Sequence, residues 1–304
     1  MRFEGSNVKL TVNENLKGYI MFSSNIDDNE IKKRMDNFRN NIEKGVNKGD
    51  VTLELMSIFG DNYICPVEMK IYDIGTPFYR VRSIPSEDIC NPFKTISRIE
   101  DAWEPPEYII KTRGRLNNIN ESILYCCPDD FELAIDEARA RDNSYIAIMV
   151  YKSYRKIKYT VLGDYENSSL PKDNKTKLLY SFLNEEFSIV VANGEENRYS
   201  ITHAIANSYF SYPEQDAWCY RSIQSSKKFN VAFLPKKSKD CLNLMGVIIC
   251  NPKKLPNGNY NVKYVIDFDK VSNNIRYHKI DSEWQKKIFP EIINGEVSST
   301  VIKK

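Results

Sequence analysis

The run Tyr145–Tyr151 is almost continuously apolar and is bounded by polar residues, and it restricts the fold more than any other segment. A run of this length predicts a buried strand. No apolar run reaches the roughly 18 residues that a membrane-spanning helix needs, so we expect no contact with a membrane. The first residues also lack the apolar core of a signal peptide, which predicts a cytoplasmic protein.

Strand-like alternation occurs elsewhere in the chain. Over Pro77–Ser83 apolar and polar residues alternate, which predicts a strand. Tyr79 and Val81 then share one face of this strand, and Arg80 and Arg82 share the other. Further strands are expected over residues 216–222, 229–234, 244–250 and 259–268.

Helix-like spacing is clearest near the N-terminus. Apolar residues three or four apart predict a helix over residues 28–46, with Asp27 or Asp28 as its N-cap. A second helix is expected to begin after Asp129 or Asp130 and to present Glu137 at the flank of its apolar face. Further helices are expected over residues 50–59, 175–187, 198–209 and 282–288.

The composition excludes several classes of protein. The 43 basic and 41 acidic residues give a net charge of +2, which argues against a dedicated nucleic-acid or membrane-surface protein. Seven cysteines without a Cys-x-x-Cys pair argue against a disulfide framework and against structural zinc. The two histidines, His203 and His278, are too few for a His-rich metal centre. The nucleophile elbow, the phosphate loop and the dinucleotide fingerprint are all missing from the sequence.

Arginine is concentrated in one segment. The whole chain has 29 lysines and 14 arginines, whereas residues 80–141 have seven arginines and two lysines. A guanidinium group offers a planar fork that binds phosphate or carboxylate through two parallel hydrogen bonds. These side chains therefore suit an anionic ligand, although ordinary ion pairs explain them equally well. They are Arg80, Arg82, Arg98, Arg113, Arg115, Arg139 and Arg141.

An ordered series of short fragments lies between residues 77 and 235. They are Tyr79-Arg80-Val81-Arg82, Asn91-Pro92-Phe93, Gly114-Arg115-Leu116-Asn117, Leu124-Tyr125, Ala134 with Glu137, Tyr199 with Thr202, and Tyr220-Arg221-Ser222. This series resembles the RES domain, a bacterial family named for an arginine, a glutamate and a serine. The sequence departs from the family motif at Leu116, where an aromatic residue is common.

The resemblance implies an α+β fold similar to that of the ADP-ribosyltransferases, with a split mixed sheet and flanking helices. We expect this RES-like catalytic domain over residues 71–240, after a helical N-terminal region at residues 1–70 and before a β-rich extension at residues 241–304. Known members of the family degrade NAD as hydrolases or phosphorylases, and many are toxins held in check by an antitoxin. NAD is thus the expected substrate, water or inorganic phosphate the expected acceptor, an antitoxin a candidate partner, and no metal is expected.

The resemblance carries the family's site positions onto Arg115, Tyr125, Glu137 and Ser222, and its early arginine onto Arg80. Arg82 joins them because it shares a strand face with Arg80. This residue set fits the chemistry, since loss of nicotinamide passes through an oxocarbenium-like ribose that a carboxylate stabilises. The arginines suit binding of the pyrophosphate. Tyr125 suits stacking on a ring of the substrate or orienting Glu137, and Ser222 suits a hydrogen bond to a ribose or phosphate oxygen.

Each residue also has an ordinary structural interpretation. Taken alone, Glu137 would be a solvated carboxylate, Tyr125 a packed ring and Ser222 a turn cap. Gly114 would allow the backbone to approach a ligand closely. Two other functions stay open: transfer of ADP-ribose to a macromolecule, and binding of a nucleotide or nucleic acid without turnover. The near-neutral charge weakens the nucleic-acid alternative, and the sequence leaves a homo-oligomer open.

Overall fold

The computed structural model describes residues 26–43, 54–60 without 56, 66–88 and 94–299 without 167, 171, 193, 226, 270, 271 and 273. The described helices are α1 (Asp28–Glu43), α3 (Phe131–Glu137), α4 (Asn174–Ser188), α5 (Tyr199–Tyr209) and α6 (Glu283–Ile288). The strands are β1 (Met69–Tyr72), β2 (Pro77–Ile84), β3 (Leu124–Pro128), β4 (Tyr145–Ser153), β5 (Ile157–Leu162), β6 (Ala217–Arg221), β7 (Phe229–Phe233), β8 (Leu242–Lys254), β9 (Tyr260–Phe268), β10 (Ile275–His278) and β11 (Glu296–Val297).

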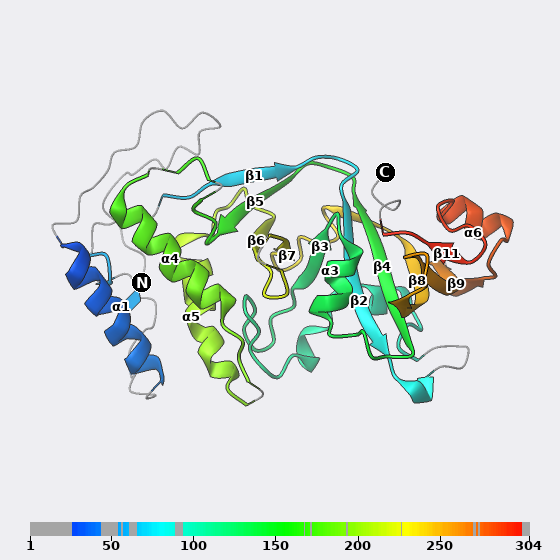
Figure 1. Cartoon of the computed structure of the whole chain (residues 1–304), viewed down its shortest axis with the longest axis horizontal. Coiled ribbons are helices and arrows are strands. Elements are labelled where there is room, and N and C mark those ends of the chain that lie inside the picture. The colour runs from blue at the N-terminus through cyan, green and yellow to red at the C-terminus, as the bar shows by residue number, and fades with distance from the viewer. Residues whose placement is uncertain are drawn as a thin grey trace.

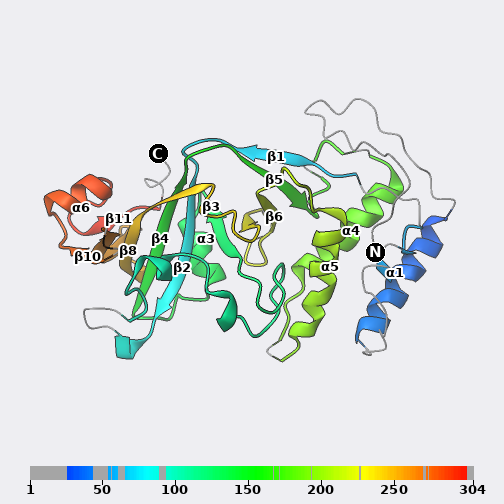
Figure 2. The same ribbon diagram turned by 180° about the vertical axis from the view of Figure 1, so that it is seen from behind.

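The fold is a mixed α+β architecture built on a large open sheet. Eleven strands of the described chain lie in the order β1-β5-β6-β7-β3-β2-β4-β8-β9-β10, with β11 also paired to β9. The pairings are antiparallel except for the parallel pair β5 and β6. Helices α4 and α5 lie side by side at one end of the molecule with α1 beyond them, and α6 lies at the other end (Figures 1 and 2).

Strand β4 occupies the centre of this sheet, as the apolar run Tyr145–Tyr151 predicts. It pairs with β2 over eight residues and with β8 on its other side. Residues 146–151 are all buried. Because β8 follows residue 241, the C-terminal strands continue the central sheet across the expected boundary between the second and third segments.

The pairing of neighbouring strands is interrupted between β2 and β3. These two strands share only the pairs Phe78 with Pro128 and Tyr79 with Cys127. Beyond them, β2 continues beside β4, whereas β3 continues beside β7. The sheet is therefore forked between β2 and β3, and we call this place the fork.

Three apolar clusters fill the interior. One lies under α3, one lies among α1, α4, α5 and β6, and the third contains side chains from both halves of the sheet. Pairing register puts Tyr79, Tyr125 and Cys127 on the same face of the sheet, the face that α3 covers. Arg80 and Arg82 belong to the opposite face, as the alternation predicts.

The local signals for helices are also confirmed. Asp27 caps α1 by accepting hydrogen bonds from the backbone of Asn29 and Glu30 at 2.9 Å, and Asp130, not Asp129, caps α3. The expected helices near residues 175–187, 198–209 and 282–288 are α4, α5 and α6. Half of the helix expected at residues 50–59, and the end of the first helix beyond Glu43, lie outside the described residues; of the described part, residues 54, 55 and 57 are helical. None of the described helices combines the length and apolarity that a membrane crossing requires.

Candidate functional site

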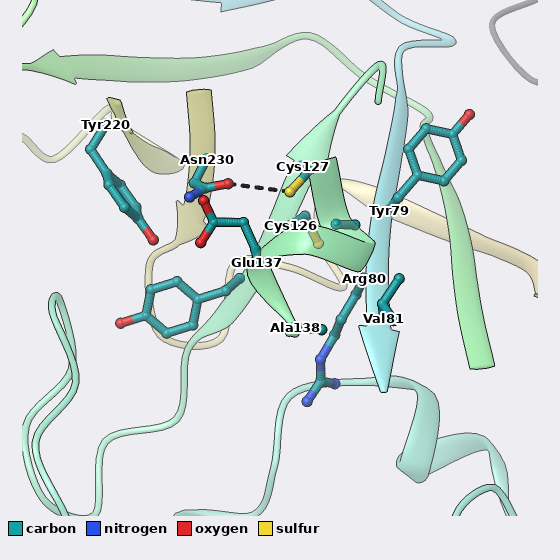
Figure 3. Close-up of a pocket in the computed structure, with 11 residues that line it drawn as sticks. Tyr79, Arg80, Val81, Cys126, Cys127, Glu137, Ala138, Tyr220 and Asn230 are labelled. Carbon is teal, nitrogen blue, oxygen red and sulfur yellow. Dashed lines mark hydrogen bonds between the residues drawn. The ribbon is translucent and has the colours of Figure 1, made fainter. Parts of the chain in front are cut away.

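A pocket of about 250 Å³ opens at the fork (Figure 3). Its walls come from β2 and β3 just beyond their last shared pair, from the end of α3, and from β6 and β7. The lining residues are Tyr79, Arg80, Val81, Tyr125, Cys126, Cys127, Ala134, Glu137, Ala138, Tyr220 and Asn230. Three residues predicted from the sequence, Arg80, Tyr125 and Glu137, are thus brought to one cavity from segments up to 57 positions apart.

Glu137 is the last residue of α3, and its half-buried side chain points into the pocket (Figure 3). The hydroxyl of Ser222, which follows β6, donates a hydrogen bond to Glu137 Oε1. The same hydroxyl accepts hydrogen bonds from the backbone nitrogens of Gln224 at 3.0 Å and Ser225 at 3.2 Å. Ser222 is therefore both a turn cap and a partner of the acid, so its two interpretations from sequence are compatible.

The hydroxyl of Tyr125 is fully used inside the protein. It donates to Asn117 Oδ1 at 3.0 Å and accepts from the backbone nitrogen of Leu116 at 3.1 Å. Burial raises the pKa of Tyr125, so the phenol stays protonated. The ring lines the pocket while the hydroxyl holds the 114–117 loop, so Tyr125 shapes the pocket and anchors the loop.

Gly114 is required by this same loop. A Cβ atom built on Gly114 would lie 2.2 Å from Asn117 Oδ1. The glycine therefore makes room for the amide that Tyr125 binds, and the close neighbour that the structure shows at Gly114 is Asn117.

Arg115 is held beside the pocket with one nitrogen unused. Its Nη2 donates to the backbone oxygen of Ile189 at 3.1 Å, and its guanidinium carbon lies 5.9 Å from the ring of Tyr199 and 5.7 Å from that of Tyr220. Its Nη1 is buried and has no hydrogen-bond partner among the residues that the structure describes. A buried donor without a partner is costly, which makes this nitrogen a candidate contact for an anion.

Arg80 and Arg82 extend from β2 toward the segment 101–103. Arg80 lines the pocket and donates to the backbone oxygen of Trp103. Arg82 donates to the backbone oxygen of Asp101 at 2.8 Å and is not among the lining residues. Burial and the charge of Arg80 lower the pKa of Arg82. The structure therefore places Arg82 outside the pocket lining, although it shares the strand face of Arg80 as predicted.

Three of the remaining arginines in the Arg-rich segment make ordinary contacts. Arg141 pairs with Asp136 at 2.7 Å, Arg98 lies 3.9 Å from Asp101, and Arg113 donates to Asn118 at 3.1 Å. The arginines of this segment thus have two kinds of role: some make structural contacts, whereas Arg80 and Arg115 lie at or beside the pocket.

Two further lining residues, Tyr220 and Asn230, carry polar groups and are absent from the site residues predicted from the sequence, although Tyr220 belongs to the fragment Tyr220-Arg221-Ser222. Tyr220 and Asn230 face each other across β6 and β7 and are both buried. Asn230 Oδ1 accepts a hydrogen bond from Cys127 Sγ at 3.2 Å (Figure 3). A signal was present for Asn230, because it is the polar residue in the apolar strand Phe229–Phe233.

Within the described ranges, no group of three or more His, Cys, Asp or Glu side chains could hold a metal ion. His203 lies on α5, away from the pocket lining, with Nε2 3.3 Å from Glu121 Oε2. This hydrogen bond lowers the pKa of Glu121. Both described members of the Cys126-Cys127 pair are buried free thiols.

No model of a known protein family matches the chain, and no curated protein matches its sequence.

Proposed function

We propose that this protein cleaves the bond between nicotinamide and ribose in NAD, in the manner of the RES domain that its fragments resemble. The observation that carries the proposal is the contact between Glu137 and Ser222 at a pocket that Arg80 and Tyr125 also line. All four residues belong to the motif series of the sequence.

The chemistry of the pocket supports this reaction. Nicotinamide leaves as a neutral molecule with the electron pair of the broken bond, so no strong general acid is needed. Positive charge then develops on the ribose, and the carboxylate of Glu137 can stabilise it. The hydrogen bond from Ser222 fixes one carboxylate oxygen and leaves the other for a ribose hydroxyl.

The size of the pocket limits how much of the dinucleotide it takes. Pockets that bury a drug-sized ligand have roughly 300–1,000 Å³, and this one has about 250 Å³. We propose that it holds the nicotinamide and its ribose, with the pyrophosphate outside. Arg115, which contacts the lining residue Tyr220, offers its unused Nη1 to a phosphate oxygen there.

The proposal includes the finer description of the fold and the biological role. The two-pair junction of β2 and β3 supports an ADP-ribosyltransferase-like split of the sheet. Water as the acceptor would give ADP-ribose and a proton, and inorganic phosphate would give phosphorylated ADP-ribose. A toxin or defence effector restrained by an antitoxin is the role that the resemblance favours.

The test is to incubate the purified full chain with NAD, with and without inorganic phosphate, and to identify the ribosyl product by mass. We expect free nicotinamide together with ADP-ribose or its phosphate. If no nicotinamide is released under either condition, the proposal is wrong. If the ADP-ribose group instead appears on a macromolecule, the reaction is a transfer.

A further inference from the structure

Asn230 is a buried amide in an otherwise apolar strand. Only 5% of its surface is exposed, and Asn230 lines the pocket beside Tyr220 (Figure 3). A buried amide without hydrogen-bond partners is destabilising, so such a residue needs a reason to be there. The structure satisfies one half of the amide, through Cys127 Sγ to Asn230 Oδ1 at 3.2 Å.

The other half of the amide is available to a ligand. In the part of the chain that the structure describes, Asn230 Nδ2 donates no hydrogen bond. Because Oδ1 already accepts from Cys127, Asn230 presents its N–H donors to the pocket. These donors suit a ligand group that accepts hydrogen bonds. Glu137 presents the opposite character, since an ionised carboxylate only accepts.

Cys127 is suited to hold the amide in this orientation. It belongs to the junction with β2, where it pairs with Tyr79, and it is buried; burial together with the charge of Glu137 raises the pKa of its thiol. The sulfur therefore keeps its hydrogen and donates it to Asn230 Oδ1, which holds the amide in this orientation. A thiolate would turn the amide round and remove the free donor from the pocket.

We propose that Asn230 is a substrate-recognition residue whose Nδ2 donates to the carboxamide oxygen of nicotinamide, and that Cys127 is the residue that positions it. The inference rests on the proposed function, because it takes the nicotinamide end of NAD as the occupant of the pocket. Two aromatic rings, Tyr125 and Tyr220, line the same pocket and suit the flat pyridine ring. The carbonyl of its carboxamide is the acceptor that Nδ2 requires.

The experiment measures binding of nicotinamide and of NAD to the full chain by calorimetry, alongside KM and kcat for nicotinamide release. Asn230→Asp replaces the donor with an acceptor, so we expect both ligands to bind at least about tenfold more weakly, with a matching rise in KM. Cys127→Ala should raise KM about threefold, and Cys127→Ser, which keeps a donor, should restore it. Cys250→Ala, at another buried thiol that is not among the lining residues, is the matched control and should leave KM unchanged.

Thermal unfolding identifies any variant that fails to fold, in which case Asn230→Ser replaces Asn230→Asp and should weaken binding in the same direction. Equal affinity of the wild type and a folded Asn230 variant overturns the inference, as does a wild type that binds neither nicotinamide nor NAD. Binding of NAD without release of nicotinamide overturns the proposed function alone, since recognition by Asn230 is then still measured directly.

Discussion

Ser222 donates a hydrogen bond to Glu137, and this contact joins the end of β6 to the last residue of α3 across 85 positions of sequence. Ser222 itself is fixed by the backbone nitrogens of Gln224 and Ser225. The carboxylate therefore has a defined orientation in the protein before any ligand binds, which is the condition for electrostatic stabilisation of a developing charge.

Replacing Glu137 with Gln should abolish most of the reaction. The amide can still accept the hydrogen bond from Ser222, but it lacks the negative charge, so we expect nicotinamide release to fall about 10²- to 10³-fold with the fold intact. Release is measured by chromatography, and folding by circular dichroism. Asp136→Asn on the same helix removes a charge that pairs with Arg141 and is the matched control. Full nicotinamide release by folded Glu137→Gln would exclude Glu137 as the catalytic carboxylate.

Replacing Arg115 with Met should separate binding from stability. The substitution loses the hydrogen bond to Ile189 but also removes a buried nitrogen without a partner, so the free energy of unfolding should change by less than about 1 kcal/mol. KM for NAD should rise about tenfold, because the phosphate loses its donor. Denaturant unfolding and steady-state kinetics measure the two quantities, and Arg113→Met is the control. An unchanged KM would show that the free Nη1 serves no ligand.

Replacing Gly114 with Ala should disturb the loop that Tyr125 holds. The new Cβ would lie 2.2 Å from Asn117 Oδ1, so we expect a loss of about 1–3 kcal/mol in unfolding free energy. Asn117→Ala removes that oxygen and leaves the Tyr125 hydroxyl at 3.5 Å, an ordinary contact. In the Asn117→Ala background, Gly114→Ala should therefore cost much less. Equal costs in the two backgrounds would place the strain elsewhere, and a double-mutant cycle by urea unfolding decides between the two results.

Asp267 should make stability depend on pH in acid. Burial raises the pKa of Asp267, but hydrogen bonds from Arg276 and His278 outweigh it and hold that pKa below its usual range. The stabilisation is therefore complete above the usual value of about 4 and is lost as the pH falls through the lower value of the folded state. Asp267→Asn should unfold at a lower temperature than the wild type at about pH 6, and the difference should shrink by about pH 3.

Thermal scans over this range measure the effect, with Asp73→Asn as a control because that side chain is 83% exposed. A difference between Asp267→Asn and the wild type that stays constant down to acid pH would show that the charge of Asp267 adds no stability.

The sequence predicted the features that depend on residues close together in the chain. The apolar run that became β4, the caps Asp27 and Asp130, and the alternation that sets Arg80 and Arg82 opposite Tyr79 all depend on neighbours in the chain. The motif series added Glu137 and Ser222, which the structure joins by a hydrogen bond.

What the sequence did not predict depends on which strands become neighbours. The fork arises because β3 pairs with β7 beyond Cys127, and no periodicity specifies that choice of partner. For the same reason alternation could not place Arg82, whose face is correct but whose guanidinium ends at Asp101. Asn230 was missed because its partner, Cys127, is 103 positions away.

The fork gives the two halves of the sheet few direct backbone pairings. Beyond two residue pairs between β2 and β3, the contact between Glu137 and Ser222 is one of the interactions that hold them in register. A change in the angle between the halves therefore alters the aim of the carboxylate without any change in the residues that line the cavity.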